Sequence, residues 1–193
     1  MKNEITGMRL RLIVMNFLQF AVWGAYLTSM GTYLFNIGLG AKIGLFYAMQ
    51  GIVSLFMPAI MGIIADRWVP AQKLYGFCHF MAAVFMVAAG WYGYVDGEAV
   101  NFGTLFTFYS LSVAFYMPTL ALTNSVAYTA LDKVKLDPVI AFPPIRIFGT
   151  IGFICSMLLT DILGFQNNYM QFFSCACFGV ILAEIGRASC RER

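Results

Sequence analysis

The chain has 193 residues, of which 61% are hydrophobic and only 11% carry a charge. Soluble domains carry about 25% charged residues, so this composition excludes a soluble protein and indicates an integral membrane protein. The formal net charge of +3 is explained by basic loops at one membrane face, so we expect no nucleic-acid partner.

Six apolar stretches approach the length of about 20 residues that a helix needs to cross a hydrocarbon core of about 30 Å. We predict helices because lipid offers no partner for backbone polar groups, and because the stretches lack the alternating pattern of a membrane β-barrel. They predict an all-α bundle over residues 1–183, with spans at 12–34, 43–65, 74–95, 102–130, 142–165 and 169–184.

Basic side chains occur in alternate loops, and this bias predicts the orientation in the membrane. One set of segments contains Lys2, Arg9 and Arg11 before the first span, Arg67 and Lys73 in the second loop, and Lys133 and Lys135 in the fourth. The loops between them hold only Lys42, or Asp96 and Glu98, or no charge. We therefore predict a cytoplasmic N-terminus. The first span is too long for a signal peptide, so we expect it to remain as a membrane helix.

In the first span, Asn16, Gln19, Trp23 and Tyr26 are spaced three, four and three residues apart. This spacing places them on one helical face. Amides and amphipathic aromatic rings on one face suit a ligand that needs stacking and directional hydrogen bonds. Hydrogen bonding and aromatic packing between helices would explain the same pattern. Both interpretations stay open at this stage.

The second loop reads Gly62-x-x-x-Asp66-Arg67. A glycine lets two helices approach closely, and the acid and the base can form charge pairs that hold a gate shut. An interfacial ion pair with little effect on stability is the alternative. The spacing resembles the loop motif of the major facilitator superfamily, but the Gly-Arg-Arg/Lys that usually follows is absent.

Residues 142–153 read FPPIRIFGTIGF and place Arg146 inside an apolar run. We expect this helix to begin upstream, near Val139 or at Pro143–Pro144, because proline is tolerated in a first turn. Arg146 would then lie up to about 10 Å along the helix. Its guanidinium would either reach back to the membrane surface or face a watery cavity.

Arg146, Thr150 and Phe153 are spaced at i, i+4 and i+7, so a fork of donors, a hydroxyl and a ring share one face. Such a face fits a small, planar, hydroxylated solute. Gly149 and Gly152 would let a neighbouring helix pack closely on another side.

The chain ends in EIGRASCRER, which interrupts the sixth apolar run with charges and no turn residues. The decapeptide resembles a translated sequencing adapter, so we expect residues 184–193 to be a non-native tail; a genuine basic C-terminus is the alternative. The five cysteines lie mostly inside spans without other metal ligands, so we expect packing roles, no metal site and no cofactor.

Four segments carry a resemblance to a known family: LQFAVWGAYLTSMGTYL, FMPAIMGIIAD, FYMPTLALTNSVAY and FPPIRIFGTIGF. They are similar to the nucleoside:proton symporters of the major facilitator superfamily, along nearly all of residues 9–183. The resemblance implies a multi-pass permease of the bacterial inner membrane that takes up nucleosides with protons. It also implies that Arg146, Thr150 and Phe153 contact the nucleoside, whereas Gln19 and Trp23 are candidates from spacing alone.

Six spans in two groups of three would form the N-terminal half, a 3+3 inverted repeat, of a twelve-helix transporter that works by alternating access. The partners expected are therefore a nucleoside, protons, lipid and a missing C-terminal six-helix half. We expect the proton-coupling acid in that half, since neither Asp66 nor Asp161 is near Arg146 in sequence. For His79 we favour packing over proton relay.

Other functions remain open on the sequence. A facilitator for sugars would have a more polar cavity, and a drug transporter a more apolar one. A membrane assembly subunit without transport activity is a further alternative. An enzyme would show clustered nucleophiles, bases or metal ligands, and no such cluster is visible, so we expect no enzymatic activity.

Overall fold

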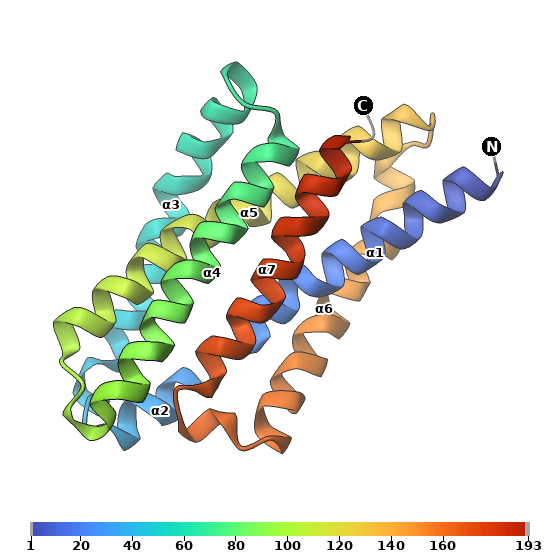
Figure 1. Cartoon of the computed structure of the whole chain (residues 1–193). Helices are drawn as coiled ribbons and strands as arrows, with labels where there is room; N and C mark the ends of the chain where they lie inside the picture. Colours follow the sequence, from blue (N-terminus) through green and yellow to red (C-terminus); the bar gives the residue numbers. More distant parts are fainter. Residues whose placement is uncertain (1, 192–193) are drawn as a thin grey trace.

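The computed structural model describes residues 2–191, apart from the side chains of residues 2–4, 98 and 187–191. Over this range the chain forms α-helices and short 3-10 helices and contains no strand. Their bounds are α1 Lys2–Gly24, α2 Met30–Asn36, η1 Gly40–Lys42, α3 Ile43–Arg67, α4 Ala71–Asp96, η2 Gly97–Ala99, α5 Phe102–Lys133, α6 Pro138–Ile162, η3 Phe165–Asn167 and α7 Met170–Arg191 (Figure 1).

The long helices run alternately in opposite directions, so their connections gather at two ends of the bundle (Figure 1). The chain begins at the end where α3 turns into α4 and α5 turns into α6, and α7 returns to this end. The opposite end holds α2, η2 and η3. In the bundle α4 packs between α5 and α7, α1 packs against α6 and α7, and α3 packs against α5.

Five helical segments are long and apolar enough to cross a membrane: Ile5–Gly24, Gly40–Arg67, Ala71–Asp96, Phe102–Lys133 and Pro138–Ile162. The sixth predicted span is present as α7, whose apolar part, Met170–Gly186, is shorter. The all-α fold of the prediction is therefore confirmed in the described range, and five of the six predicted spans are long enough to cross a membrane. The predicted tail at 184–193 falls largely on side chains outside the described ones, so it stays a prediction.

The predicted first span, residues 12–34, is wrong in two respects. Its helix begins ten positions earlier, at Lys2, and it is interrupted between Gly24 and Met30, so that α1 and α2 are separate. At the interruption the hydroxyls of Ser29 and Thr160 each lie 3.3 Å from the carbonyl oxygen of Ala25. These hydroxyls compete for a carbonyl that a continuous helix would bond to a backbone N–H.

A third hydroxyl supports the interruption from another helix. Tyr47 of α3 donates to the carbonyl oxygen of Leu27 at 2.7 Å. In lipid a free backbone carbonyl is costly, so an irregular segment is tolerated where side chains replace the missing hydrogen bonds. The interrupted backbone is thus held by α3 and α6.

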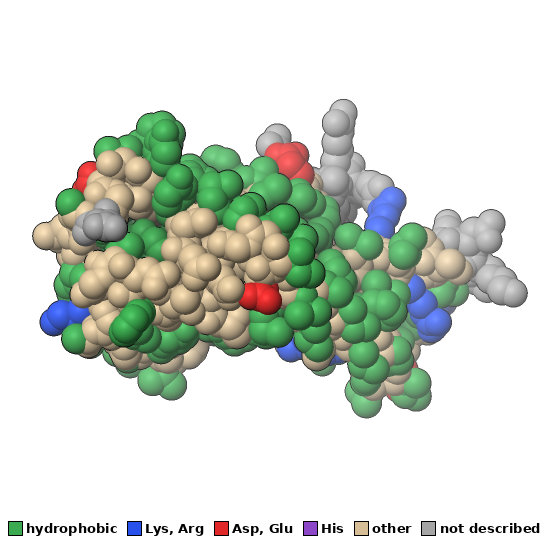
Figure 2. Space-filling model, turned by 90° about the horizontal axis from the view of Figure 1, so that it is seen from below, with side chains coloured by type: hydrophobic (Ala, Val, Ile, Leu, Met, Phe, Trp, Pro, Cys, Tyr) green, Lys and Arg blue, Asp and Glu red, His purple; other side chains and the backbone are tan. Residues whose placement is uncertain are grey.

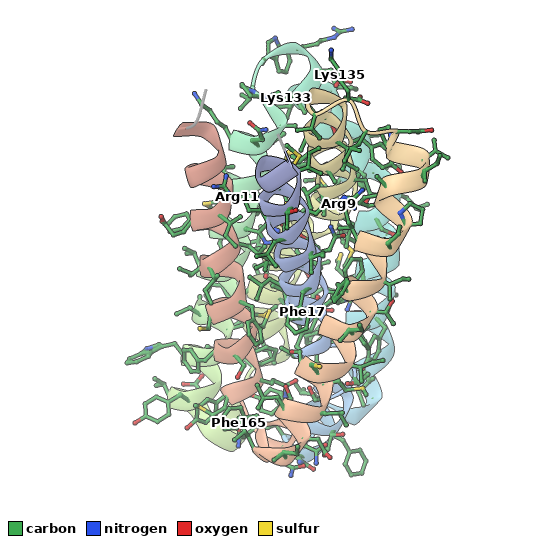
Figure 3. The ribbon with its side chains drawn as sticks, turned by 90° about the vertical axis from the view of Figure 1, so that its right-hand side faces the viewer. Arg9, Arg11, Phe17, Lys133, Lys135 and Phe165 are labelled. Atoms are coloured by element: carbon green, nitrogen blue, oxygen red, sulfur yellow. The ribbon has the colours of Figure 1, made fainter. Side chains whose placement is uncertain are left out.

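Basic side chains gather toward one end of the bundle. In Figure 3, Lys133 and Lys135 lie at this end, Arg9 and Arg11 lie in the same half, and Phe165 lies at the opposite end. The clustering has the pattern that orientation rules associate with a cytoplasmic face.

The peripheral helices expose apolar side chains rather than polar ones. In α3, 11% of the residues in the most apolar part of the helix are buried, and in α6 the share is 28%. In α4, at the centre of the bundle, the share is 56%. The face seen in Figure 2, viewed from below, shows many hydrophobic side chains beside areas of other side chains and backbone, with few charges. Exposed residues such as Leu55, Phe56 and Ile147 therefore suit lipid or a further helical layer.

Glycines bring α1 and α6 into direct backbone contact. A methyl group at Gly152 would strike the carbonyl oxygen of Phe17, and one at Gly24 would strike the carbonyl oxygen of Phe153. Phe17 lies where α1 and α6 meet in Figure 3. The expectation that Gly149 and Gly152 allow a neighbouring helix to pack closely is therefore confirmed, with α1 as that neighbour. The expected separate side is wrong, because α1 is also the helix that Arg146 and Phe153 contact.

We expect Gly152→Ala to destabilise the protein, because the added methyl group must push α1 and α6 apart. Overpacking of this kind lowers the free energy of unfolding by roughly 1–3 kcal/mol. Thermal unfolding in detergent, followed by circular dichroism, measures the effect. Gly44→Ala is the matched control, since no described atom lies within 4 Å of a methyl group there. Equal unfolding midpoints for the two variants would contradict the assigned contact.

Candidate functional site

Helix α6 begins at Pro138, one residue before the Val139 start that the sequence suggested. The side chain of Asp137 caps it by accepting from the backbone N–H of Val139 at 2.9 Å. Pro143 and Pro144 lie inside the helix rather than at its start. Arg146 therefore lies about 12 Å along α6 from its first residue.

Arg146 points toward α1. The guanidinium carbon lies 4.0 Å from the centroid of the Phe20 ring, a geometry that is typical of a cation–π contact. Gly149 provides the space, because a methyl group at this position would lie 2.6 Å from the Phe20 ring and 2.9 Å from Arg146 Nη1. The guanidinium thus packs against a neighbouring helix and does not extend along its own helix to the surface.

Three rings continue the site along α1 and α6. Trp23 meets Phe153 edge to face, with centroids 6.3 Å apart and planes at 83°. The Phe20 and Trp23 rings are 6.4 Å apart and tilted. We call Phe20, Trp23, Arg146, Thr150 and Phe153 the α1–α6 site.

The α1–α6 site is partly exposed in this chain. Thr150 is exposed, and Arg146, Phe153, Phe20 and Trp23 are half-buried. The site offers a fork of charged donors, a hydroxyl and aromatic edges, which together can hold a planar solute that carries hydrogen-bonding groups. The predicted shared face of Arg146, Thr150 and Phe153 is thus complemented by two rings from α1.

Gln19 faces α4 and α5 on an adjacent side of α1, with no exposed surface. Its Oε1 accepts from the Tyr75 hydroxyl at 2.9 Å and lies 2.8 Å from Nε2 of His79. Its Nε2 donates to the Thr119 hydroxyl at 2.8 Å. The backbone carbonyl oxygen of Gln19 accepts from the Tyr116 hydroxyl at 2.6 Å. Every polar group of the Gln19 side chain is therefore bonded to α4 or α5.

The partners fix the direction of the Gln19 amide. The Thr119 hydroxyl donates its own hydrogen to the carbonyl oxygen of Tyr116 at 2.6 Å, so it can only accept from Gln19. Oε1 then faces His79, and because a carbonyl oxygen only accepts, Nε2 of His79 carries the hydrogen. A solute would reach Gln19 only if α1 separated from α4 and α5.

The other two residues of the predicted α1 face are also interior. Asn16 donates to the carbonyl oxygen of Leu12 at 2.9 Å within α1. Tyr26 is buried and packs edge to face on Tyr109 of α5, with centroids 6.1 Å apart. Of the four spaced residues, only Trp23 lies in the α1–α6 site; the interpretation as packing between helices is confirmed for Gln19 and Tyr26.

The loop motif lies at the end of a helix. Gly62, Asp66 and Arg67 all belong to α3, and Asp66 and Arg67 are exposed. These two residues line a cavity of about 380 Å³ with residues 68–72 and with Val126 and Thr129 of α5. No described side chain or neighbouring helix lies within 4 Å of a methyl group placed at Gly62, so close helix packing there stays a prediction.

Phe20 is a site residue that the sequence reasoning missed. It follows Gln19 directly and precedes Trp23 by three positions, so its spacing to Trp23 could have indicated a shared face. The polar stripe drew attention to an adjacent side of α1. Nothing in the sequence indicated that Arg146 of α6 would contact the ring of Phe20 on α1.

The helices define a multi-pass membrane protein, and the α1–α6 site gathers a guanidinium, a hydroxyl and aromatic rings. The family described as "Nucleoside H+ symporter" matches residues 6–186. The chain therefore belongs to the nucleoside H+ symporter family, as its sequence motifs predicted.

Individual proteins similar to this chain have names that are consistent with this family. The xanthosine permease of Escherichia coli (strain K12) is 39% identical over 176 residues, which cover 90% of this chain and 40% of that protein. The nucleoside permease NupG of the same strain is 38% identical over 179 residues, which cover 91% and 41%. The chain thus spans about 40% of the length of these relatives.

A solved structure supports the fold. The crystal structure of the nucleoside transporter NupG matches with a TM-score of 0.86 and 37% identity, over 94% of this chain and 44% of that chain. The prediction that the chain folds as about half of a transporter of this type is confirmed.

We expect Gln19→Leu to lower the free energy of unfolding more than Thr123→Val does. Leucine leaves the Tyr75 and His79 groups without their acceptor, and an unpaired buried polar group costs about 1–3 kcal/mol. Thr123→Val removes only one hydroxyl, which lies 3.0 Å from Gln19 Oε1. Thermal unfolding in detergent compares the two variants. A smaller loss for Gln19→Leu would show that the network does not hold α1.

Proposed function

We propose that this chain is the N-terminal half of a transporter that takes up nucleosides with protons across the bacterial inner membrane. Membership of the nucleoside H+ symporter family supports this function. The names of its relatives, a xanthosine permease and the nucleoside permease NupG, support the substrate class. The coverage of about 40% supports a missing second half, around which alternating access would take place.

The observation that carries the proposal is the position of Arg146 over Phe20, beside the edge-to-face pair Trp23 and Phe153. A nucleoside combines a flat base with a hydroxylated sugar. In the proposed arrangement the rings contact the base, while Arg146 and Thr150 donate hydrogen bonds to its polar groups. A drug-type cavity would not need the guanidinium, and a sugar site would have fewer rings.

We propose that the N-terminus is cytoplasmic, because the basic residues of α1 and of the α5–α6 turn lie toward one end (Figure 3). This places Asp66 and Arg67 at the cytoplasmic end of α3. There they would pair with charges of the second half to close the inward gate. Their exposure in this chain leaves both side chains accessible for such pairs.

We propose that the proton-coupling acid belongs to the second half. Asp66 lies at the end of α3, and Asp161 lies about 22 Å along α6 from Arg146. Neither carboxyl group is placed to exchange a proton in step with solute binding at Arg146. His79 is buried against Gln19, which supports a packing role.

The complete transporter, expressed in cells without other nucleoside uptake, should accumulate radiolabelled uridine. A proton uncoupler should abolish accumulation above the external concentration, because the proton gradient supplies the driving force. The 193-residue chain should not transport alone, since alternating access needs two halves. Absence of nucleoside uptake by a well-expressed complete transporter would reject the substrate class.

Arg146→Ala and Arg146→Lys should both reduce uridine kcat/KM in the complete transporter. A loss of about tenfold or more is expected for Arg146→Lys, because a point ammonium cannot reproduce a planar fork stacked on Phe20. Uptake at a range of uridine concentrations, normalised to protein in the membrane, gives the ratio. Arg9→Lys is the matched control and should transport normally. Normal transport by Arg146→Ala would exclude Arg146 as a substrate contact.

A further inference from the structure

Trp23 is the only member of the α1–α6 site whose polar atom has an assigned partner on a third helix. Its indole Nε1 donates to Oε1 of Gln50 on α3 at 3.0 Å. Nε2 of Gln50 donates in turn to the hydroxyl of Tyr109 on α5. A continuous path of hydrogen bonds thus leads from the site to the core.

This path has one chemically allowed direction. An indole N–H only donates, so the group that faces it must be the amide oxygen of Gln50. The amide nitrogen must then face Tyr109, whose hydroxyl oxygen accepts. A rotated amide would place two donors against each other at Trp23. Gln50 therefore holds the indole in one orientation.

The members of the path that lie away from the site are buried. Gln50 is 7% exposed, and Tyr109 is fully buried between the rings of Phe46 and Tyr26. Trp23 itself is half-buried, and its ring edge faces Phe153. Without an anchor, the large indole would have several side-chain rotamers available at the edge of an open site.

We propose that Gln50 is a positioning residue, which fixes the Trp23 indole against Phe153 and so sets the orientation of the aromatic surface that contacts the base of the solute. The proposal rests on the proposed function in naming a nucleoside base as the ligand. Gln50 itself touches Trp23 and Tyr109 and need not touch the solute. It thereby extends the determinants of affinity to α3, a helix that contributes no member of the α1–α6 site.

The first test is transport kinetics in the complete transporter. Gln50→Leu should raise the KM for uridine about 2- to 10-fold with little change in kcat, because one orienting hydrogen bond is lost. Gln50→Glu keeps an acceptor for the indole and should restore KM toward the wild-type value. Gln166→Leu, in η3 at the far end of the bundle, is the matched control and should leave KM unchanged.

A purely structural role would change the amount of protein or kcat and leave KM unaltered, and this result would overturn the proposal. Equal KM values for Gln50→Leu and Gln50→Glu would also overturn it. If Gln50→Leu fails to accumulate, Tyr109→Phe serves instead, because it removes only the acceptor that orients the Gln50 amide. Tyr109→Phe should then raise KM in the same direction; an unchanged KM would count against the proposal.

A second readout does not depend on transport. Trp23, Trp68 and Trp91 are the three tryptophans of the chain, and Trp68 and Trp91 are 73% and 61% exposed. In the 193-residue chain with Trp68→Phe and Trp91→Phe, Trp23 is a single fluorophore. Its fluorescence anisotropy should fall in Gln50→Leu and recover in Gln50→Glu; unchanged anisotropy would overturn the proposal. If uridine is not transported but anisotropy responds as expected, the proposed function fails while the positioning role stands.

Discussion

The arrangement of this half-transporter depends on the requirement that a buried amide in a membrane find its partners within the protein. Gln19 meets this requirement on α1, where Tyr75 and His79 of α4 and Thr119 of α5 bond its side chain. These directional bonds fix the rotation of α1 about its own axis. That rotation decides that Trp23 and Phe20 face α6.

Helix α1 packs against its neighbours through two kinds of contact. Toward α4 and α5, polar side chains specify one register, because each donor has a defined acceptor. Toward α6, Gly24 and Gly152 let the backbones of the two helices come into contact. Close packing, rather than directional hydrogen bonding, characterises this side. Arg146 is compatible with this environment because the ring of Phe20 covers its guanidinium on one side and the open site keeps the other accessible. The polar interior and the α1–α6 site thus lie on adjacent faces of the same helix.

Much of this organisation could be predicted from the sequence, and the exceptions have physical reasons. The shared face of Arg146, Thr150 and Phe153 follows from helical periodicity alone. The same periodicity grouped Gln19 with Trp23, but α1 has protein on several sides, so neighbouring positions face different helices.

The break after Gly24 was missed because the hydroxyls that support it include those of Tyr47 and Thr160, far away in sequence. The motif at Gly62 does not show whether its partner helix lies in the same chain, so close packing there stays a prediction. Phe20 and Gln50 become visible only when three helices are placed together.

The glycine contact between α1 and α6 has a consequence for how such proteins diverge. Gly24 directly follows Trp23, and Gly152 directly precedes Phe153, so the residues that set the helix separation adjoin the two rings that face each other. A single methyl group at either glycine would separate the rings without altering a ring, a hydroxyl or a charge. Two homologous transporters could therefore have identical binding side chains and still discriminate between small and large bases. Comparison of binding residues alone would overlook the cause, which lies in atoms that the solute never reaches.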